Sequence, residues 1–200
     1  MSAPGLRLYA APATQPLTAA QVKSRLRVTT TDEDTDLAAM LASACELCQA
    51  ECGRVFVTQT WVLTLDQFPL GYLSGHDARY VGPAIRLPLP PLVSVTHVKY
   101  YDADGEQQTV SSADYWVAAG GDPGRIVPAS GYWPATQLRR PGAVEVRFVC
   151  GYGDASLVPD AAKSAILVTL AAMRDDPAGA MGVPPAARRA LDTLEYGEVR

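Results

Sequence analysis

Residues 35–68, TDLAAMLASACELCQAECGRVFVTQTWVLTLDQF, change from a helical to a strand pattern at Gly53. At 100° per residue, one apolar stripe runs along residues 35–52. The stripe consists of Leu37, Met40, Leu41, Ala44, Cys45, Cys48 and Cys52. From Val55 to Phe68, β-branched and aromatic residues alternate with polar ones, which is typical of a strand. The stretch therefore predicts a helix joined to a strand by a glycine turn.

The same two patterns continue on both sides of this stretch. Further strands are predicted over residues 85–87, 93–101, 107–110, 115–118, 125–127 and 143–150. Asp104-Gly105 is a hairpin signal that pairs the second of these strands with the third. Helices are predicted over residues 19–27, 161–174 and 186–196, the first of them capped by Thr18.

The order of these elements predicts an α+β fold, in which N-terminal and C-terminal helices form a bundle around an inserted antiparallel β module. Residues 1–17 are rich in proline and alanine and are expected to form an irregular arm. The main domain is expected over residues 18–174, with helices in 18–53 and 159–174 around a β module of 55–150. Residues 175–200 are expected to be a linker and a detached tail helix.

The composition points to a surface that other proteins cover. Hydrophobic residues make up 48% of the 200 residues, while charged residues make up only 19%, against about 25% in average globular proteins. The net charge of −4 argues against a nucleic-acid binder, which needs a clustered basic face. The longest apolar stretch, residues 161–173, contains Lys163 and is too short to span a bilayer. A soluble protein without a signal peptide or a membrane partner is expected.

Three cysteines with the spacing Cys45-x-x-Cys48-x-x-x-Cys52 form the most tempting cluster for a metal site. Zinc would need thiolates converging at about 2.3 Å, with Cys150 or His97 as the fourth ligand. All three cysteines lie on the apolar stripe, however, and buried cysteines ordinarily behave as small hydrophobes. No metal and no other cofactor is therefore predicted.

The motifs for catalysis are incomplete. Ser74-Gly-His76-Asp77 contains the letters of a triad, but adjacent residues rarely align as nucleophile, base and carboxylate. No G-x-S-x-G elbow occurs. Gly151-Tyr-Gly153 has Ser156 where a dinucleotide loop has its third glycine. The interpretation is a protein that is not an enzyme, with a small hydrolase using Ser74 and His76 as an alternative.

Several stretches together carry a family resemblance. They are Cys52-Gly-Arg leading into Val57-Thr-Gln-Thr-Trp61, the run IRLPLPPLVSV from Ile85, and VEVRFVCGYG from Val144. In this order, over about residues 18–174, they resemble the head–tail connector (adaptor) proteins of tailed phages, prophages and gene transfer agents. Members of that family look like helical bundles with an inserted β module.

The resemblance implies a structural subunit of a homo-oligomeric ring, typically twelvefold, assembled in the bacterial host cytoplasm. The ring docks under the portal protein at the neck of the particle and extends its DNA channel, which DNA crosses without sequence-specific binding. Its other side meets a head-closure (stopper) protein or a tail protein. Another neck component, such as a head-closure or tail-terminator protein, is the alternative, although those proteins are usually mostly β.

Two groups of residues are candidates for these contacts. The helix over residues 161–174 is apolar almost all round, which predicts a neighbouring subunit against it. Its ring-interface candidates are Ile166, Leu167, Leu170 and Met173. Aspartate at position 167 or 170 is expected to give a folded monomer.

The tail helix supplies the candidates for docking to the portal protein. They are Arg188, Arg189, Leu191, Leu194, Tyr196 and Arg200. Because so short a helix is marginal alone, it is expected to become ordered on binding. Deleting the residues after Asp176 is therefore expected to spare folding and to abolish docking.

Overall fold

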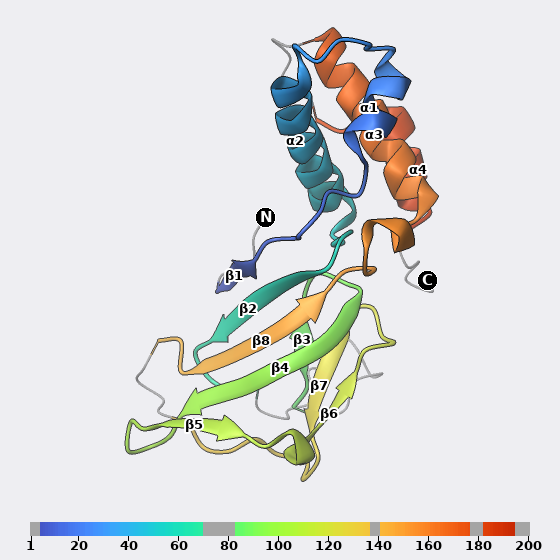
Figure 1. Cartoon of the computed structure of the whole chain (residues 1–200). Coiled ribbons are helices and arrows are strands. Elements are labelled where there is room, and N and C mark those ends of the chain that lie inside the picture. The colour runs from blue at the N-terminus through green and yellow to red at the C-terminus, as the bar shows by residue number, and fades with distance from the viewer. Residues whose placement is uncertain (1–4, 70–82, 137–140, 177–181, 195–200) are drawn as a thin grey trace. The chain divides into compact units, whose positions relative to one another are not determined.

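The computed structural model describes residues 5–69, 83–136, 141–176 and 182–194 of the chain (Figure 1). The chain divides into two compact units. One unit comprises Met1–Ala11 and Gln59–Gly151 and contains the strands; the other comprises Pro12–Thr58 and Tyr152–Arg200 and contains the α-helices. The predicted α+β fold class is confirmed. None of the described helices is both long enough and apolar enough to cross a membrane.

The larger sheet of the strand unit has five antiparallel strands in the order β1-β2-β8-β4-β5. Their bounds are β1 Leu6–Ala10, β2 Gln59–Leu65, β4 Leu92–Tyr101, β5 Gln107–Val110 and β8 Val144–Cys150. Figure 1 shows β8 between β2 and β4. In β8, Val144, Val146 and Phe148 are fully buried while the residues between them are half-exposed, so one face of this strand packs into the core. The predicted β4–β5 hairpin is confirmed.

A smaller antiparallel sheet has the order β3-β7-β6. Its strands are β3 Ile85–Leu87, β6 Tyr115–Ala118 and β7 Gly124–Pro128, and the short helix η1, Ser112–Asp114, precedes β6. A Cβ atom at Gly124 would lie 2.6 Å from Cβ of Leu92 in β4, so the two sheets approach each other too closely here for any larger residue. The aromatic core includes Trp133, whose ring stacks on Phe68 at 4.8 Å between centroids.

The helical unit is built around one hydrophobic core that all its α-helices share. The helices are α1 Ala19–Leu26, α2 Asp34–Cys52, α3 Asp160–Asp175 and α4 Pro185–Asp192, and a short helix, η2 Ala155–Leu157, precedes α3. Helix α3 contacts α1, α2 and α4. The Thr18 and Gln21 side chains form a capping box at the start of α1, and Gly53, with φ of 63°, ends α2.

The predicted strand over residues 55–68 begins later than expected. Residues 55–58 are not part of β2, and Phe56 and Val57 lie in the core of the helical unit. Their backbone pairs instead with the returning chain: Tyr152 N donates to Phe56 O at 2.9 Å, and Thr58 N donates to Gly153 O at 3.0 Å. These residues are apolar because they are buried among helices. The sequence pattern alone does not tell this kind of burial from burial in a sheet.

The prediction of an irregular arm over residues 1–17 is wrong for β1. Leu6 is paired with Leu63 of β2, and Leu8 with Trp61. Gly5, with φ of 86°, precedes the strand, and a Cβ atom there would lie 2.3 Å from Thr64 O. Four of the five β1 residues are exposed, so the edge strand lacks the alternation of apolar residues that would reveal it.

Candidate interaction surfaces

Helix α3 is the centre of the helical unit rather than a bare apolar surface. Ile166 and Leu170 are fully buried within the single chain. The prediction that they face a neighbouring subunit is therefore wrong, because α1, α2 and α4 already cover them. Leu167 and Met173 are half-buried at the edge of the same core. Of the four predicted ring-interface residues, these two retain surface that a second copy can cover.

Helix α4 is likewise part of the unit and not a detached tail. Leu191 is 1% exposed and lies in the shared core, so it is not available to a partner in this conformation. Leu194 is half-buried, and Arg188 and Arg189 are exposed. Arg188 Nε lies 2.5 Å from Glu51 Oε1 of α2, which fixes one side of α4. The other two docking candidates, Tyr196 and Arg200, lie outside the described residues.

A groove runs between α1 and α3 on the surface of the helical unit. Its apolar part is formed by Leu17, which is buried, and Leu167, which is half-buried. The charged residues that line it are Arg25, Arg27, Lys163 and Asp160. Three basic groups against one acidic group give the groove a positive balance. Lys163 Nζ also donates to Ser156 O at 3.4 Å.

Acidic residues are concentrated on α2. This helix contains Asp34, Asp36, Glu46 and Glu51 and has no lysine or arginine. Its core face is formed by Leu37, Leu41, Ala44, Cys45 and Cys48. The opposite, exposed face carries Asp36, Ala39, Ser43, Glu46 and Ala50. The exposed face of α2 is therefore acidic and lined mainly by short side chains.

Three ion pairs link α2 and the turn before it to the basic elements of the same unit. Lys23 of α1 pairs with Asp34. Arg174 Nη2 of α3 lies 2.9 Å from Glu33 Oε2, and Arg188 pairs with Glu51. Among the described residues, Arg25, Arg27, Lys163, Asp36 and Glu46 take part in no ion pair. These charges remain free for contacts outside the unit.

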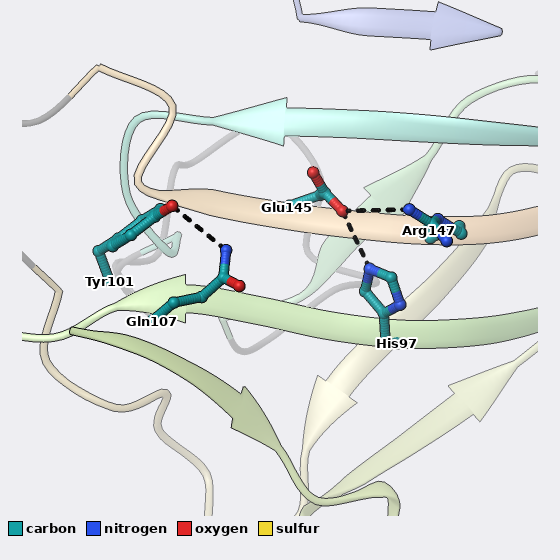
Figure 2. A network of polar contacts seen from close by, with 5 residues as sticks. All are labelled: His97, Tyr101, Gln107, Glu145 and Arg147. Atoms are coloured by element: carbon teal, nitrogen blue, oxygen red, sulfur yellow. Dashed lines mark hydrogen bonds and ion pairs between the residues drawn. The ribbon is translucent and has the colours of Figure 1, made fainter. Parts of the chain in front are cut away.

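A polar network lies on the five-stranded sheet (Figure 2). His97 Nε2 of β4 and Glu145 Oε1 of β8 form a hydrogen bond of 3.0 Å, and Arg147 Nη2 lies 3.8 Å from the same oxygen. The Arg147 guanidinium also lies over the ring of Tyr9, with Cζ 3.8 Å from the centroid. The contacts tie β1, β8 and β4 together on the more polar face of the sheet. Because the Glu145 carboxylate is shared between His97 of β4 and Arg147 of β8, the arrangement fits a structural role.

The cysteines lie where neutral thiols are favoured. Burial raises the pKa of Cys45 to about 12, with the neighbouring Cys48 and Glu46 adding to the effect. Burial also raises the pKa of Cys48, and it raises the pKa of Cys52 to about 11. Cys52 Sγ donates to Cys48 O at 3.1 Å, and Cys48 Sγ lies 3.5 Å from Thr169 Oγ1.

The fourth-ligand candidates lie in the strand unit, whereas the three helix cysteines lie in the helical unit. Burial raises the pKa of Cys150 to about 12, and His97 is engaged by Glu145. Within the described parts of the chain, no group of three or more His, Cys, Asp or Glu side chains is placed to hold a metal ion. Metal ligation requires thiolates, so these thiols are better suited to packing.

The hydrolase alternative is not located in the structure, because Ser74 and His76 lie outside the described residues.

The aromatic residues are divided between core and surface. Trp133 is buried, and its Nε1 donates to Pro83 O at 2.5 Å. Trp116 of β6 is 66% exposed and Tyr132 is 73% exposed, so these two have large apolar areas free for contact.

Sequence reasoning missed the α1–α3 groove. Arg25 and Arg27 are spaced by two residues, which does not form one helical face. The structure brings them beside Lys163, which lies more than a hundred residues further along the chain. One sequence feature could have pointed to the groove. Helix α2 has no lysine or arginine, so the basic residues of the helical unit must lie on its other elements.

Comparison with known proteins reveals extensive structural similarity. A chain in the neck of an empty GTA particle, solved with C6 symmetry, superposes with a TM-score of 0.76 and 21% identity. A chain in the virion of a native gene transfer agent (GTA) particle gives 0.76 and 20%. A chain in the neck of a native GTA particle, solved with C12 symmetry, gives 0.74 and 18%. Each match covers 98% of this chain and 97% of the other.

No model of a known protein family and no curated protein matches the sequence. The similarity thus lies in the fold, over nearly the whole length of both chains. The resemblance to neck connector proteins that the sequence motifs indicate is confirmed at this level: the chain has the fold of proteins from gene transfer agent particles, two of which were resolved in the particle neck.

Proposed function

We propose that this chain is a structural subunit of the head–tail connector (adaptor) ring in the neck of a phage or phage-like particle. The observation that supports it most is the structural match to chains in GTA necks, which extends over 98% of this chain. The sequence motifs of connector proteins, over residues 18–174, support the same assignment independently of the fold. The role is mechanical and requires neither a catalytic residue nor a cofactor.

A homo-oligomeric ring is supported by the C6 and C12 symmetry with which the similar necks were solved. A closed ring needs a heterologous interface, in which one surface of a subunit meets a different surface of the next. We assign Leu167 and Met173 to the ring interface, since both side chains have exposed apolar surface at the edge of the core. Twelve copies are expected, as is typical of connectors.

Docking to the portal protein is assigned to the end of α4 and the residues after it. Arg188, Arg189 and Leu194 are accessible at least in part, and Tyr196 and Arg200 complete the candidate set. Leu191 is excluded because it anchors α4 in the core.

The opposite side of the ring meets a head-closure or tail protein, and DNA passes through the channel without sequence-specific binding. The net charge of −4 is compatible with a channel wall that does not bind DNA tightly.

The test is deletion of the gene in a producing strain, followed by electron microscopy of the particles. Filled heads without attached tails are expected, and complementation with the wild-type gene should restore complete particles. A cryo-electron microscopy map of the restored neck should place a ring of this chain directly below the portal. A ring placed at the tail end of the neck would identify a tail terminator instead, and complete particles without the chain would contradict the proposal.

A further inference from the structure

The helical unit has two complementary surfaces on different sides. The groove between α1 and α3 has an apolar part, Leu17 and Leu167, and an excess of basic groups. The exposed face of α2, with Asp36 and Glu46, points away from the core that α2 shares with α3. A positive groove and a negative helix face on one unit cannot meet each other within that unit. They can meet between two copies.

We infer that the exposed face of α2 of one copy seats in the α1–α3 groove of the next copy, and that this contact closes the proposed ring. The inference rests on the proposed function and specifies the surfaces through which the ring forms. The contact is heterologous, as a closed ring requires, because each copy offers both surfaces once.

Charge complementarity supports the match. Arg25, Arg27 and Lys163 outnumber the single acid of the groove, Asp160. Asp36 and Glu46 belong to a helix without any basic residue. None of Arg25, Lys163, Asp36 and Glu46 forms an ion pair in the described parts of the chain, so seating would not break an internal pair. Charged surfaces of opposite sign fix register and exclude wrong partners.

Shape supports it as well. Ala39, Ser43 and Ala50 lie on the same exposed line of α2 as the two acids. Short side chains allow the backbone of a helix to approach a groove closely, so that α2 can contact Leu167. Leu167 is half-buried in the single chain and would lose its remaining exposure in this contact. The low charge content of the chain, 19%, agrees with a surface that is partly covered.

Two charge-reversed variants test the contact. The first, Arg25→Glu with Lys163→Glu, makes the groove acidic while α2 stays acidic. The second, Asp36→Lys with Glu46→Lys, makes α2 basic while the groove stays basic. Each variant alone would bring like charges together at every interface. In a mixture, the acidic groove of one variant matches the basic α2 of the other, so an even-numbered ring can close with alternating copies.

The assay is complementation of the gene-deletion strain, with the copies of the chain per purified particle counted by quantitative mass spectrometry. We expect either variant alone to lower incorporation roughly tenfold or more relative to wild type. Co-expression should restore it, with the two variants present in equal amounts. Arg7→Glu, an exposed charge reversal on β1 outside both surfaces, is the control and should be incorporated as the wild type is, and circular dichroism of each purified variant checks its folding.

The outcomes separate the interface from the function. Wild-type incorporation of either variant alone would overturn the inferred contact, and so would co-expression that restores nothing from two folded variants. In both cases the proposed function would stand, because wild-type chain would still be found in the particles. Absence of the wild-type chain from purified particles would instead overturn the proposed function.

Discussion

Arg188 of α4 and Glu51 of α2 form an ion pair, with Nε and Oε1 2.5 Å apart. The pair joins the last described helix of the chain to a helix more than a hundred residues earlier. Beside it, Leu191 enters the core that α2 and α3 also form. Since an exposed ion pair stabilises a fold by less than about 1 kcal/mol, the burial of Leu191 contributes more to holding α4 in place.

Leu191→Ala is therefore expected to destabilise the helical unit. Removing a fully buried leucine side chain costs about 2 to 5 kcal/mol in the free energy of unfolding. Urea unfolding followed by circular dichroism measures the change. The control is Arg189→Ala on the exposed side of α4, expected to change the free energy by about 0.5 kcal/mol or less. An unchanged midpoint for Leu191→Ala would mean that α4 is detached in solution.

Two truncations distinguish the structural part of the C-terminus from the part assigned to docking. Deleting residues 177–200 removes Val183, Ala187 and Leu191 from the core, so a lower melting temperature is expected. This reverses the expectation from sequence that the longer deletion spares folding.

Deleting only residues 195–200 leaves every described helix intact, so the melting temperature should not change, while binding to the purified portal protein should weaken. Thermal melts and co-sedimentation measure the two effects. Full portal binding by the shorter truncation would remove Tyr196 and Arg200 from the docking surface.

Local patterns predicted most of the fold because most elements have one buried face. Strand β8 alternates buried and half-exposed residues along its length, and the sequence shows that alternation directly. Strand β1 could not be found in this way, because it is an edge strand with four of its five residues exposed, held by pairing with β2 and by the contact of Tyr9 with Arg147. Phe56 shows a different error. The sequence indicates that this residue is buried, but it does not show that the residue belongs to the helical core and not to the sheet.

The candidate surfaces were harder to predict because they depend on how helices pack. An apolar circumference on α3 predicts that something covers it, and sequence alone does not say whether the cover is another subunit or α4. The structure assigns that role to α4 and to the other helices of the unit. The groove is equally hard to see in the sequence, since Arg25 and Lys163 line one surface only when α1 packs on α3.

Aspartate substitutions on α3 are expected to separate the ring interface from the core. Leu170 is fully buried, so a charge there would lack water and a partner and should unfold the helical unit. Leu167 is half-buried beside the groove, so Leu167→Asp should retain the helical circular dichroism spectrum and reduce incorporation into particles.

The comparison needs both variants, because Leu170→Asp alone would lose assembly through unfolding. Leu167→Met, which conserves volume, is the matched control and should assemble as wild type does. Normal incorporation of folded Leu167→Asp would remove Leu167 from the interface.

The buried thiols predict how stability depends on pH. Burial raises the pKa of Cys45 from its usual 9.0 to about 12. Above pH 9 the unfolded chain has therefore lost a proton that the folded chain still holds, so deprotonation favours unfolding. The stabilising effect of the neutral thiol is fully present below pH 9 and is lost as pH rises towards 12.

Comparison with Cys45→Ala isolates this group from the other residues that titrate at high pH. The difference in free energy of unfolding between wild type and Cys45→Ala should be constant below about pH 8 and should shift against wild type as pH rises above 9. Urea titrations at intervals between pH 7 and 11 measure it. Because residue Cys45 is only 7% exposed, labelling of its thiol with a thiol reagent at pH 8 should also be much slower in the native protein than in urea. A difference that stays constant to pH 11, together with rapid labelling of native Cys45, would show that this part of α2 is open in solution.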